Sequence, residues 1–200
     1  DVAIEFTNPM VAYSNYMKAF KAGVKLVSGS TGWMAEHGEE IKKLCTEGGK
    51  TLFWSSNFSL GVSIFSALNK YLAKIMNQFP AYDVTMSETH HIHKLDAPSG
   101  TALMLADAIN EENNGAYHYV YDRSSVRQKR DPKEIGISSV RGGSIVGDHE
   151  VLFCGPDEVI TLKHTAYSRS VFANGAINAA VYLAKKEPGL YNMGNMIAEL

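Results

Sequence analysis

The order of short apolar runs and helical segments at the start of the chain constrains its fold more than any other feature. Three runs predict short strands, at residues 2–6, 25–28 and 51–54. A helix is predicted in each interval, because Asn8-Pro9 is a typical helix start and residues 34–47 carry apolar side chains at helical spacing. Strands that alternate with helices over short connections predict a parallel sheet of the α/β class.

The pattern changes after residue 58. We expect further helices over residues 60–79, 101–112 and 171–186, and further strands over residues 83–92, 137–140, 144–153 and 159–167. The strand-rich stretch has glycine turns and lies between helices, which predicts an α+β domain with an open mixed sheet. The chain is therefore expected to be an α/β protein with two domains, one formed by residues 1–58 with 169–200 and one by residues 59–168.

The charge balance and the cysteine count exclude several classes of protein. Lys and Arg number 19 and Asp and Glu 21, for a formal net charge of −2, so no basic footprint for nucleic acid or anionic lipid is expected. We find neither an apolar run long enough to span a membrane nor an export leader, and expect a cytoplasmic protein. Cys45 and Cys154 are far apart and are expected to be free thiols.

The densest polar cluster lies at residues 88–102 and includes three of the seven histidines, His90, His91 and His93. A solvated strand end before a capped helix is the plain alternative, but clustered titratable groups favour a functional site. Histidine handles protons near neutral pH, and Lys94 could serve as a general acid. A straight strand would separate His90 from Lys94 by roughly 13 Å. Both can act on one small substrate only if the strand ends or bends between them.

The segment after this cluster predicts an anion site. Ser99-Gly100-Thr101 precedes a run with helical spacing, and the free amides of a helix N-terminus bind anions. Simple helix capping would explain Ser99 alone. Together with His91 and Lys94, however, the helix start predicts a pocket for a small ligand that carries a carboxylate.

Two other kinds of site compete with this interpretation. Zinc could be held by His90, His91, His93 and Asp96, but adjacent residues of a strand point to opposite sides. A Cys-His nucleophile is less favoured still, because Cys45 lies on the apolar stripe of its helix. The loops that follow the parallel strands are a second candidate site, since ligands bind at the carboxyl ends of such strands. No G-x-G-x-x-G fingerprint occurs in the chain.

A fifteen-residue segment resembles the signature of the 4-hydroxy-tetrahydrodipicolinate (dihydrodipicolinate) reductase family: Glu88-x-His90-His91-x-x-Lys94-x-Asp96-Ala97-Pro98-Ser99-Gly100-Thr101-Ala102. Shorter matches are Gly29-Ser30-Thr31-Gly32, Asn57-Phe58-Ser59-x-Gly61-Val62, Arg141-Gly142-Gly143 and Ser168-Arg169. The resemblance covers essentially the whole chain.

The resemblance implies a reductase of lysine biosynthesis through diaminopimelate, which transfers hydride from NADH or NADPH to a cyclic dicarboxylate. It implies that His90 gives or takes a proton, that Lys94 donates one, and that His91, Gly100 and Thr101 bind substrate. The implied cofactor-binding residues are Gly29, Ser30, Thr31, Ser55, Ser56, Asn57 and Phe58; no metal is implied. Residues 1–58 and 169–200 would be a Rossmann-like dinucleotide-binding domain, and residues 59–168 would bind substrate and form a homotetramer.

The N-terminus departs from the family pattern. The chain opens with Asp1 inside a strand-like run, and the Gly-rich phosphate loop of the family would precede it. We therefore expect an incomplete Rossmann half that binds dinucleotide poorly. A catalytically silent fragment that binds dicarboxylate or supports assembly is the alternative to an active reductase.

Overall fold

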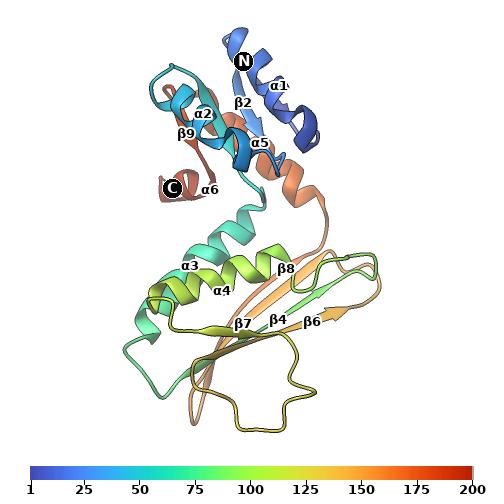
Figure 1. Ribbon diagram of the computed structural model, residues 1–200, viewed down its shortest axis with the longest axis vertical. Helices are drawn as coiled ribbons and strands as arrows, with labels where there is room; N and C mark the ends of the chain where they lie inside the picture. The colour runs from blue at the N-terminus through green and yellow to red at the C-terminus, as the bar shows by residue number, and fades with distance from the viewer. Residues whose placement is uncertain (200) are drawn as a thin grey trace. The chain divides into compact units, whose positions relative to one another are not determined.

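The computed structural model describes residues 1–199, which fold as two compact units (Figure 1). Unit 1 comprises Asp1–Ser63 together with the chain from Ser170 onward, and unit 2 comprises Ile64–Arg169. Each unit is built on its own sheet. The α/β class predicted from the sequence is confirmed, with a parallel sheet in unit 1 and a mixed sheet in unit 2.

Unit 1 contains a four-stranded parallel sheet in the order β1-β2-β3-β9. Its strands are β1 (Val2–Glu5), β2 (Lys25–Ser28), β3 (Thr51–Trp54) and β9 (Gly189–Tyr191). Its helices are α1 (Pro9–Lys21), α2 (Met34–Thr46), α5 (Ser170–Ala184) and α6 (Met193–Ala198). Helix α1 begins where the sequence predicts, because the Asn8 side chain accepts a hydrogen bond from the Met10 N–H and Pro9 occupies the first turn.

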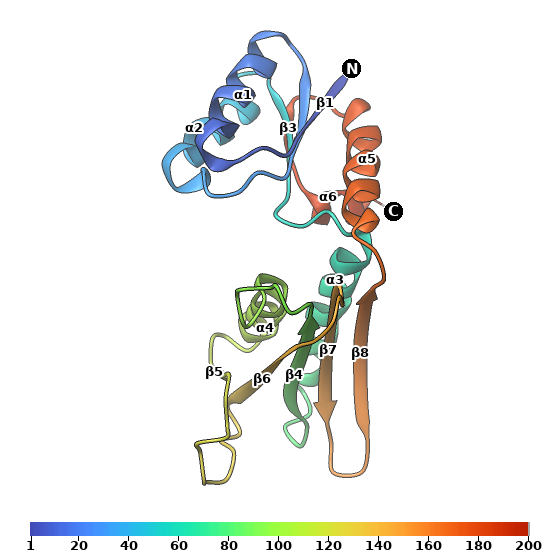
Figure 2. The same cartoon turned by 90° about the vertical axis from the view of Figure 1, so that its right-hand side faces the viewer.

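Helices cover both faces of this sheet (Figure 2). Successive side chains of a strand point to opposite faces, so Leu26 and Leu52 pack against α1 and α2, whereas Val27 and Phe53 pack against α5 and α6. Burial on both faces explains why these strands are continuous apolar runs without alternation. The arrangement leaves the carboxyl ends of β1, β2 and β3 side by side at one edge.

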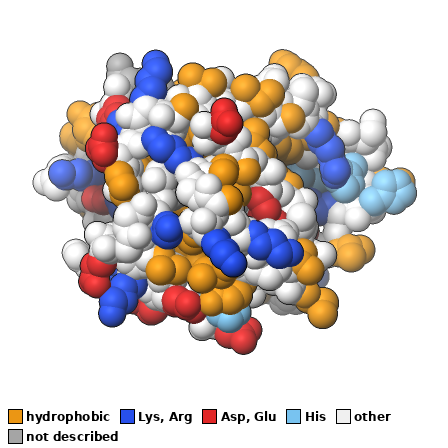
Figure 3. All heavy atoms as spheres, turned by 90° about the horizontal axis from the view of Figure 1, so that it is seen from above, with side chains coloured by type: hydrophobic (Ala, Val, Ile, Leu, Met, Phe, Trp, Pro, Cys, Tyr) orange, Lys and Arg blue, Asp and Glu red, His pale blue; other side chains and the backbone are white. Residues whose placement is uncertain are grey.

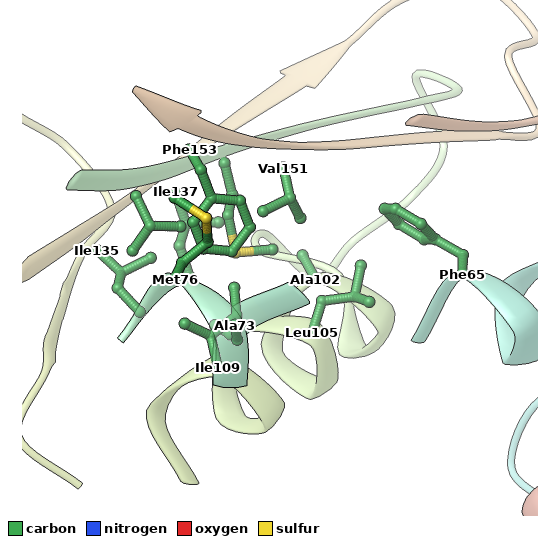
Figure 4. Packing of buried hydrophobic residues seen from close by; sticks show 13 residues of the cluster. Phe65, Ala73, Met76, Ala102, Leu105, Ile109, Ile135, Ile137, Val151 and Phe153 are labelled. Atoms are coloured by element: carbon green, nitrogen blue, oxygen red, sulfur yellow. The ribbon is translucent and has the colours of Figure 1, made fainter. Parts of the chain in front are cut away.

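Unit 2 is a five-stranded mixed sheet with helices on one face, in the order β5-β6-β4-β7-β8. Its strands are β4 (Asp83–His90), β5 (His118–Val120), β6 (Glu134–Arg141), β7 (Gly147–Cys154) and β8 (Val159–Ala166). Strand β4 is parallel to β6 and antiparallel to β7. Helices α3 (Leu60–Met76) and α4 (Gly100–Glu112) bury an apolar core against this face (Figure 4). The predicted open mixed sheet is confirmed.

Several element boundaries differ from the sequence prediction. Strand β4 ends at His90 and not at Ile92, because the chain turns after it, with the Lys94 N–H donating to the His91 carbonyl. Strand β7 begins at Gly147, since the preceding residues form a turn in which Gly143 has a φ of +50°. Strand β9 and helix α6 were not predicted, because a three-residue strand depends on its pairing with β3.

The surface carries charges of both signs, and both thiols are free. On the face seen in Figure 3, acidic and basic side chains are interspersed, in keeping with the small net charge. Within the described part of the chain, no helix combines the length and the apolar character that a membrane crossing needs. Cys45 and Cys154 are both free, and burial raises the pKa of the Cys45 thiol to about 11, which argues against a reactive thiolate.

Candidate active site

Strand β4 carries the polar cluster on the face that α3 and α4 cover. Its buried side chains alternate along the strand, with the apolar Val84 and Met86 first and Glu88 and His90 last. Glu88 is only 1% exposed and His90 7%. The apolar core under the helices therefore gives way to charged groups at the carboxyl end of β4.

The neighbouring strands add two more side chains to this face. Glu88 lies opposite His149 of β7, and His90 lies beside Arg141 of β6. His149 is 4% exposed, and its ring meets the His90 ring edge-on with centroids 5.0 Å apart. Sheet register thus brings together four polar residues that are up to 61 positions apart in the chain.

A continuous series of polar contacts runs from His90 to Lys94. Glu88 Oε2 contacts His90 Nδ1, and Glu88 Oε1 lies 2.8 Å from Arg141 Nη2. The same Arg141 nitrogen donates a hydrogen bond to the Asp96 carbonyl at 2.5 Å. The Asp96 carboxylate in turn lies 2.8 Å from Lys94 Nζ. The structure therefore connects the two residues expected to handle protons.

The strand ends between these two residues, as a shared substrate requires. The Ile92 N–H donates to the Gly143 carbonyl, and the Lys94 N–H donates to the His91 carbonyl in a turn. The strand alternation that weighed against a zinc site therefore stops at His90 and does not apply to His91 and His93. His91 Nε2 faces Arg169 Nη2 at 3.4 Å, and the rings of His91 and His93 are 6.2 Å apart.

Helix α4 begins directly after this turn. Ser99 caps it by accepting the Ala102 N–H at 3.1 Å, and the Ser99 hydroxyl also makes a 3.0 Å hydrogen bond with His149 Nε2. A side chain added at Gly100 would meet no atom within 4 Å, so the start of the helix is open. The Asp96 carboxylate lies here, where Lys94 and the Gly100 N–H both lower its pKa.

Burial and the local charges set the protonation of the cluster. Burial lowers the pKa of His90; Glu88 opposes this effect, and Lys94 and Arg141 add to it. Burial also lowers the pKa of His149 to about 4, helped by His90. Burial alone would raise the pKa of Glu88, but hydrogen bonds from Arg141, Ser139 and His90 bring it below its ordinary value. At neutral pH the cluster holds neutral imidazoles beside an ionised carboxylate.

The residues that could hold a metal ion in the structure differ from the four considered in the sequence. Among the described residues, Glu88, His90 and His149 offer ligand atoms within 4.8 Å of one another. His91, His93 and Asp96 do not belong to that group. A cation there would compete with the Arg141 guanidinium for Glu88, which the 2.8 Å ion pair already occupies.

The second candidate site is the carboxyl edge of the sheet in unit 1. The buried Glu5 carboxylate accepts hydrogen bonds from the Ser28 and Ser30 hydroxyls, at 2.5 and 3.0 Å, and from the Thr7 N–H at 3.0 Å. Burial would raise the pKa of Glu5, but these bonds lower it. Ser30 is therefore occupied by the network that shapes its loop, whereas Thr31 is exposed.

The loop after β3 lies beside that network. The Ser55 N–H donates to the Ser28 carbonyl at 3.2 Å, and the Ser55 hydroxyl donates to the Asn57 carbonyl at 2.6 Å. Ser56 is exposed, whereas the Phe58 side chain is buried against Phe53 and leaves only its backbone for contact with a ligand. The structure thus places the predicted residues 29–31 and 55–58 at neighbouring strand ends.

Sequence reasoning assigned no role to Glu88, Arg141 or His149. Glu88 could have been found, because it is two residues before His90 and so shares its face of the strand. Arg141 and His149 could not, because their positions depend on the register of β4 with β6 and β7.

Comparisons with known proteins agree with this arrangement. The family model for the dihydrodipicolinate reductase N-terminus matches residues 1–58, and the model for the C-terminus matches residues 61–197. The 4-hydroxy-tetrahydrodipicolinate reductases of Staphylococcus epidermidis and Caldanaerobacter subterraneus subsp. tengcongensis are 43% and 42% identical over 197 residues. These matches cover 98% of this chain and 78% and 76% of the two relatives.

A solved structure is similar over the same extent. The dipicolinate-bound dihydrodipicolinate reductase from Paenisporosarcina sp. TG-14 superposes with a TM-score of 0.78 at 27% identity. The match covers 98% of this chain and 73% of that one. The chain belongs to the dihydrodipicolinate reductase family.

Proposed function

We propose that this chain reduces 4-hydroxy-tetrahydrodipicolinate to tetrahydrodipicolinate with hydride from NADH or NADPH, in lysine biosynthesis through diaminopimelate. One observation carries the proposal beyond family membership. The Asp96 carboxylate is held by Lys94 and by the Gly100 N–H at the start of α4, and the Asp96 carbonyl is linked to His90 by three contacts through Arg141 and Glu88. The donors that the substrate needs already bind a carboxylate in this structure.

The net reaction replaces the ring hydroxyl by hydrogen, so one hydride and one proton enter and one water leaves. When bound, NADH or NADPH supplies the hydride. The protein must supply the proton, and Lys94 is the donor we assign. His90 is neutral at neutral pH and can take or give a proton at Nε2, because its Nδ1 faces Glu88.

We assign substrate binding to His91, Gly100 and Thr101. Amides at a helix N-terminus favour anions, and the open space above Gly100 admits a carboxylate. His91 is held by Arg169 through its Nε2 atom at 3.4 Å, so its ring orientation is defined. A cyclic dicarboxylate would then be bound through one carboxylate at α4, with its ring toward His90 and Lys94.

We assign the dinucleotide-binding domain to residues 1–58 and 169–200, and nicotinamide contacts to Gly29, Ser30, Thr31, Ser55, Ser56, Asn57 and Phe58. The residues present fit this end of a cofactor, because they gather at the carboxyl edge of a parallel sheet and carry hydroxyl and amide donors. Glu5 shapes the edge by fixing the Ser28 and Ser30 hydroxyls.

We assign substrate binding and assembly to residues 59–168, with a homotetramer formed through the open face of the five-stranded sheet. The β4 part of this face carries Asp83 and the uncharged Thr85, Ser87 and Thr89, and Thr89 pairs with the half-exposed Val140 of β6. Uncharged side chains of this kind suit burial against another copy. Sedimentation at equilibrium should give a tetramer, and Val140→Arg should yield smaller species.

Turnover and ligand binding together test the assignment. Lys94→Ala should lower kcat by roughly 10²–10⁴-fold, as expected for loss of a general acid. Lys74→Ala, which removes an exposed lysine of α3, should leave it unchanged. Dipicolinate, a cyclic dicarboxylate, should shift the backbone amide resonances of Gly100 and Thr101. Turnover by Lys94→Ala at the rate of the unaltered chain would refute the Lys94 role, and unshifted amides would refute the carboxylate site.

A further inference from the structure

We propose that Arg141 is a positioning residue that couples His90 to Lys94, with Glu88 as the link to the histidine. One guanidinium nitrogen contacts both the Glu88 carboxylate, at 2.8 Å, and the Asp96 carbonyl, at 2.5 Å. The first contact leads to His90 and the second to the turn that carries Lys94. The inference rests on the proposed function in taking these two residues as the proton-handling pair.

The surroundings of the Glu88 carboxylate determine its charge and its role as a hydrogen-bond acceptor. Its side chain is fully buried, with one oxygen against His90 Nδ1 and the other against Arg141. An ionised carboxylate without a cationic partner is unfavourable in such a place, so Arg141 keeps Glu88 charged. A charged Glu88 accepts a hydrogen bond only, and it therefore selects the His90 tautomer that has its proton on Nδ1.

This tautomer leaves His90 Nε2 as the atom that exchanges a proton. The space around that atom is also defined, because a side chain at Gly147 would approach Nε2 to 3.0 Å. Glycine at the start of β7 therefore keeps Nε2 accessible. Glu88 therefore holds the ring at Nδ1, and Gly147 leaves room for the ring at Nε2.

Arg141 is itself held at several points, as a positioning group must be. Its other terminal nitrogen, Nη1, donates to the Val140 carbonyl at 2.7 Å, and its backbone pairs with His90 at the end of β6. The planar guanidinium can serve Glu88 and Asp96 together, whereas a lysine ammonium is a point charge on a flexible stem. Arg141→Lys should therefore keep the charge beside Glu88 and lose the coupling.

The groups that face His90 from each packed element make the inference testable by titration. Glu88 comes from its own strand, Arg141 from β6, His149 from β7 and Lys94 from the turn. Glu88 raises the pKa of His90, whereas Arg141 and Lys94 lower it. Removal of Glu88 and removal of Arg141 should hence move the titration in opposite directions, which a purely structural role would not do.

The experiment is a histidine titration by nuclear magnetic resonance on the chain labelled with ¹⁵N-histidine, without substrate or cofactor. Arg141→Met should raise the pKa of His90 and Glu88→Gln should lower it, each by about 1 unit or more. The nitrogen shifts should show the Nδ1–H tautomer in the unaltered chain and a mixture in Glu88→Gln. Arg123→Met is the matched control, because Arg123 also pairs with a buried carboxylate of β6, Glu134, away from His90.

Turnover completes the test. Arg141→Lys should keep the His90 titration near that of the unaltered chain and lower kcat by about 10–100-fold with little change in KM, as displacement of catalytic groups does. If Arg141→Met and Arg141→Lys leave titration and kcat unchanged while His90→Gln abolishes turnover, the coupling is refuted and the proposed function stands. If His90→Gln and Lys94→Ala both keep full turnover, the proposed function itself is refuted.

Discussion

The free energy of unfolding should fall as the pH is lowered, and His149 should account for most of this loss. The ordinary pKa of histidine is 6.5, and burial lowers that of His149 to about 4 in the folded chain. Below pH 6.5 the unfolded chain takes up a proton that the folded chain refuses until about pH 4. Stability is therefore fully present above pH 6.5 and is lost as the pH falls toward 4. Between pH 7 and pH 5 these two values give a loss of about 2 kcal/mol from this side chain.

Urea unfolding followed by circular dichroism at pH 7 and pH 5 measures this loss. For a slope of about 2 kcal/mol/M, the midpoint should fall by about 1 M. His149→Gln removes the titrating group and should remove most of that difference. A smaller pH dependence of stability should remain, because burial also lowers the pKa values of His90 and His164. His118→Gln, at an exposed histidine of β5, should keep the full pH dependence. Equal pH dependence in His149→Gln and the unaltered chain would refute the reasoning.

Two packing predictions use matched pairs of substitutions. Gly175→Ala should destabilise unit 1 by about 1–3 kcal/mol, because the new Cβ would lie 1.6 Å from the Phe58 carbonyl oxygen. Gly38→Ala, on α2, has room for the added methyl group and should stabilise unit 1 by roughly 0.5–1 kcal/mol. Thermal unfolding checks the opposite signs, and a stabilised Gly175→Ala would contradict the close approach. Leu105→Ala should cost about 2–5 kcal/mol, because Leu105 is fully buried, and Met104→Ala, at a residue 37% exposed, should cost less than about 1 kcal/mol. Similar urea midpoints for these two variants would contradict the placement of the core.

Local signals were sufficient for most of the fold. The Asn8-Pro9 start of α1 and the apolar runs of β1, β2 and β3 depend on neighbouring residues only, so they could be predicted. The end of β4 was predicted two residues late, because the segment after His90 is held by hydrogen bonds with Gly142 and Gly143 from a distant part of the chain. Strand β9 was missed for the same reason, since its three residues are defined by pairing with β3.

Part of the candidate site could likewise be predicted from neighbouring residues alone. His90, Lys94 and the start of α4 at Gly100 belong to one continuous segment, whose residue types and order already indicated proton transfer beside a carboxylate site. The need for a strand end between His90 and Lys94 also followed from strand geometry, since a straight strand would keep them roughly 13 Å apart. These inferences required only distances along the chain.

The sequence by itself therefore determined the α/β class, the capped helices and the residues that can do chemistry, because periodicity, caps and residue types act over a few positions. Only the tertiary structure decided how those residues are charged and oriented. Glu88 is two residues from His90, but Arg141, which fixes its charge, and His149, which shares its buried face, reach it through the pairing of β4 with β6 and β7. Register and burial are properties of the assembled sheet, and pKa values depend on both.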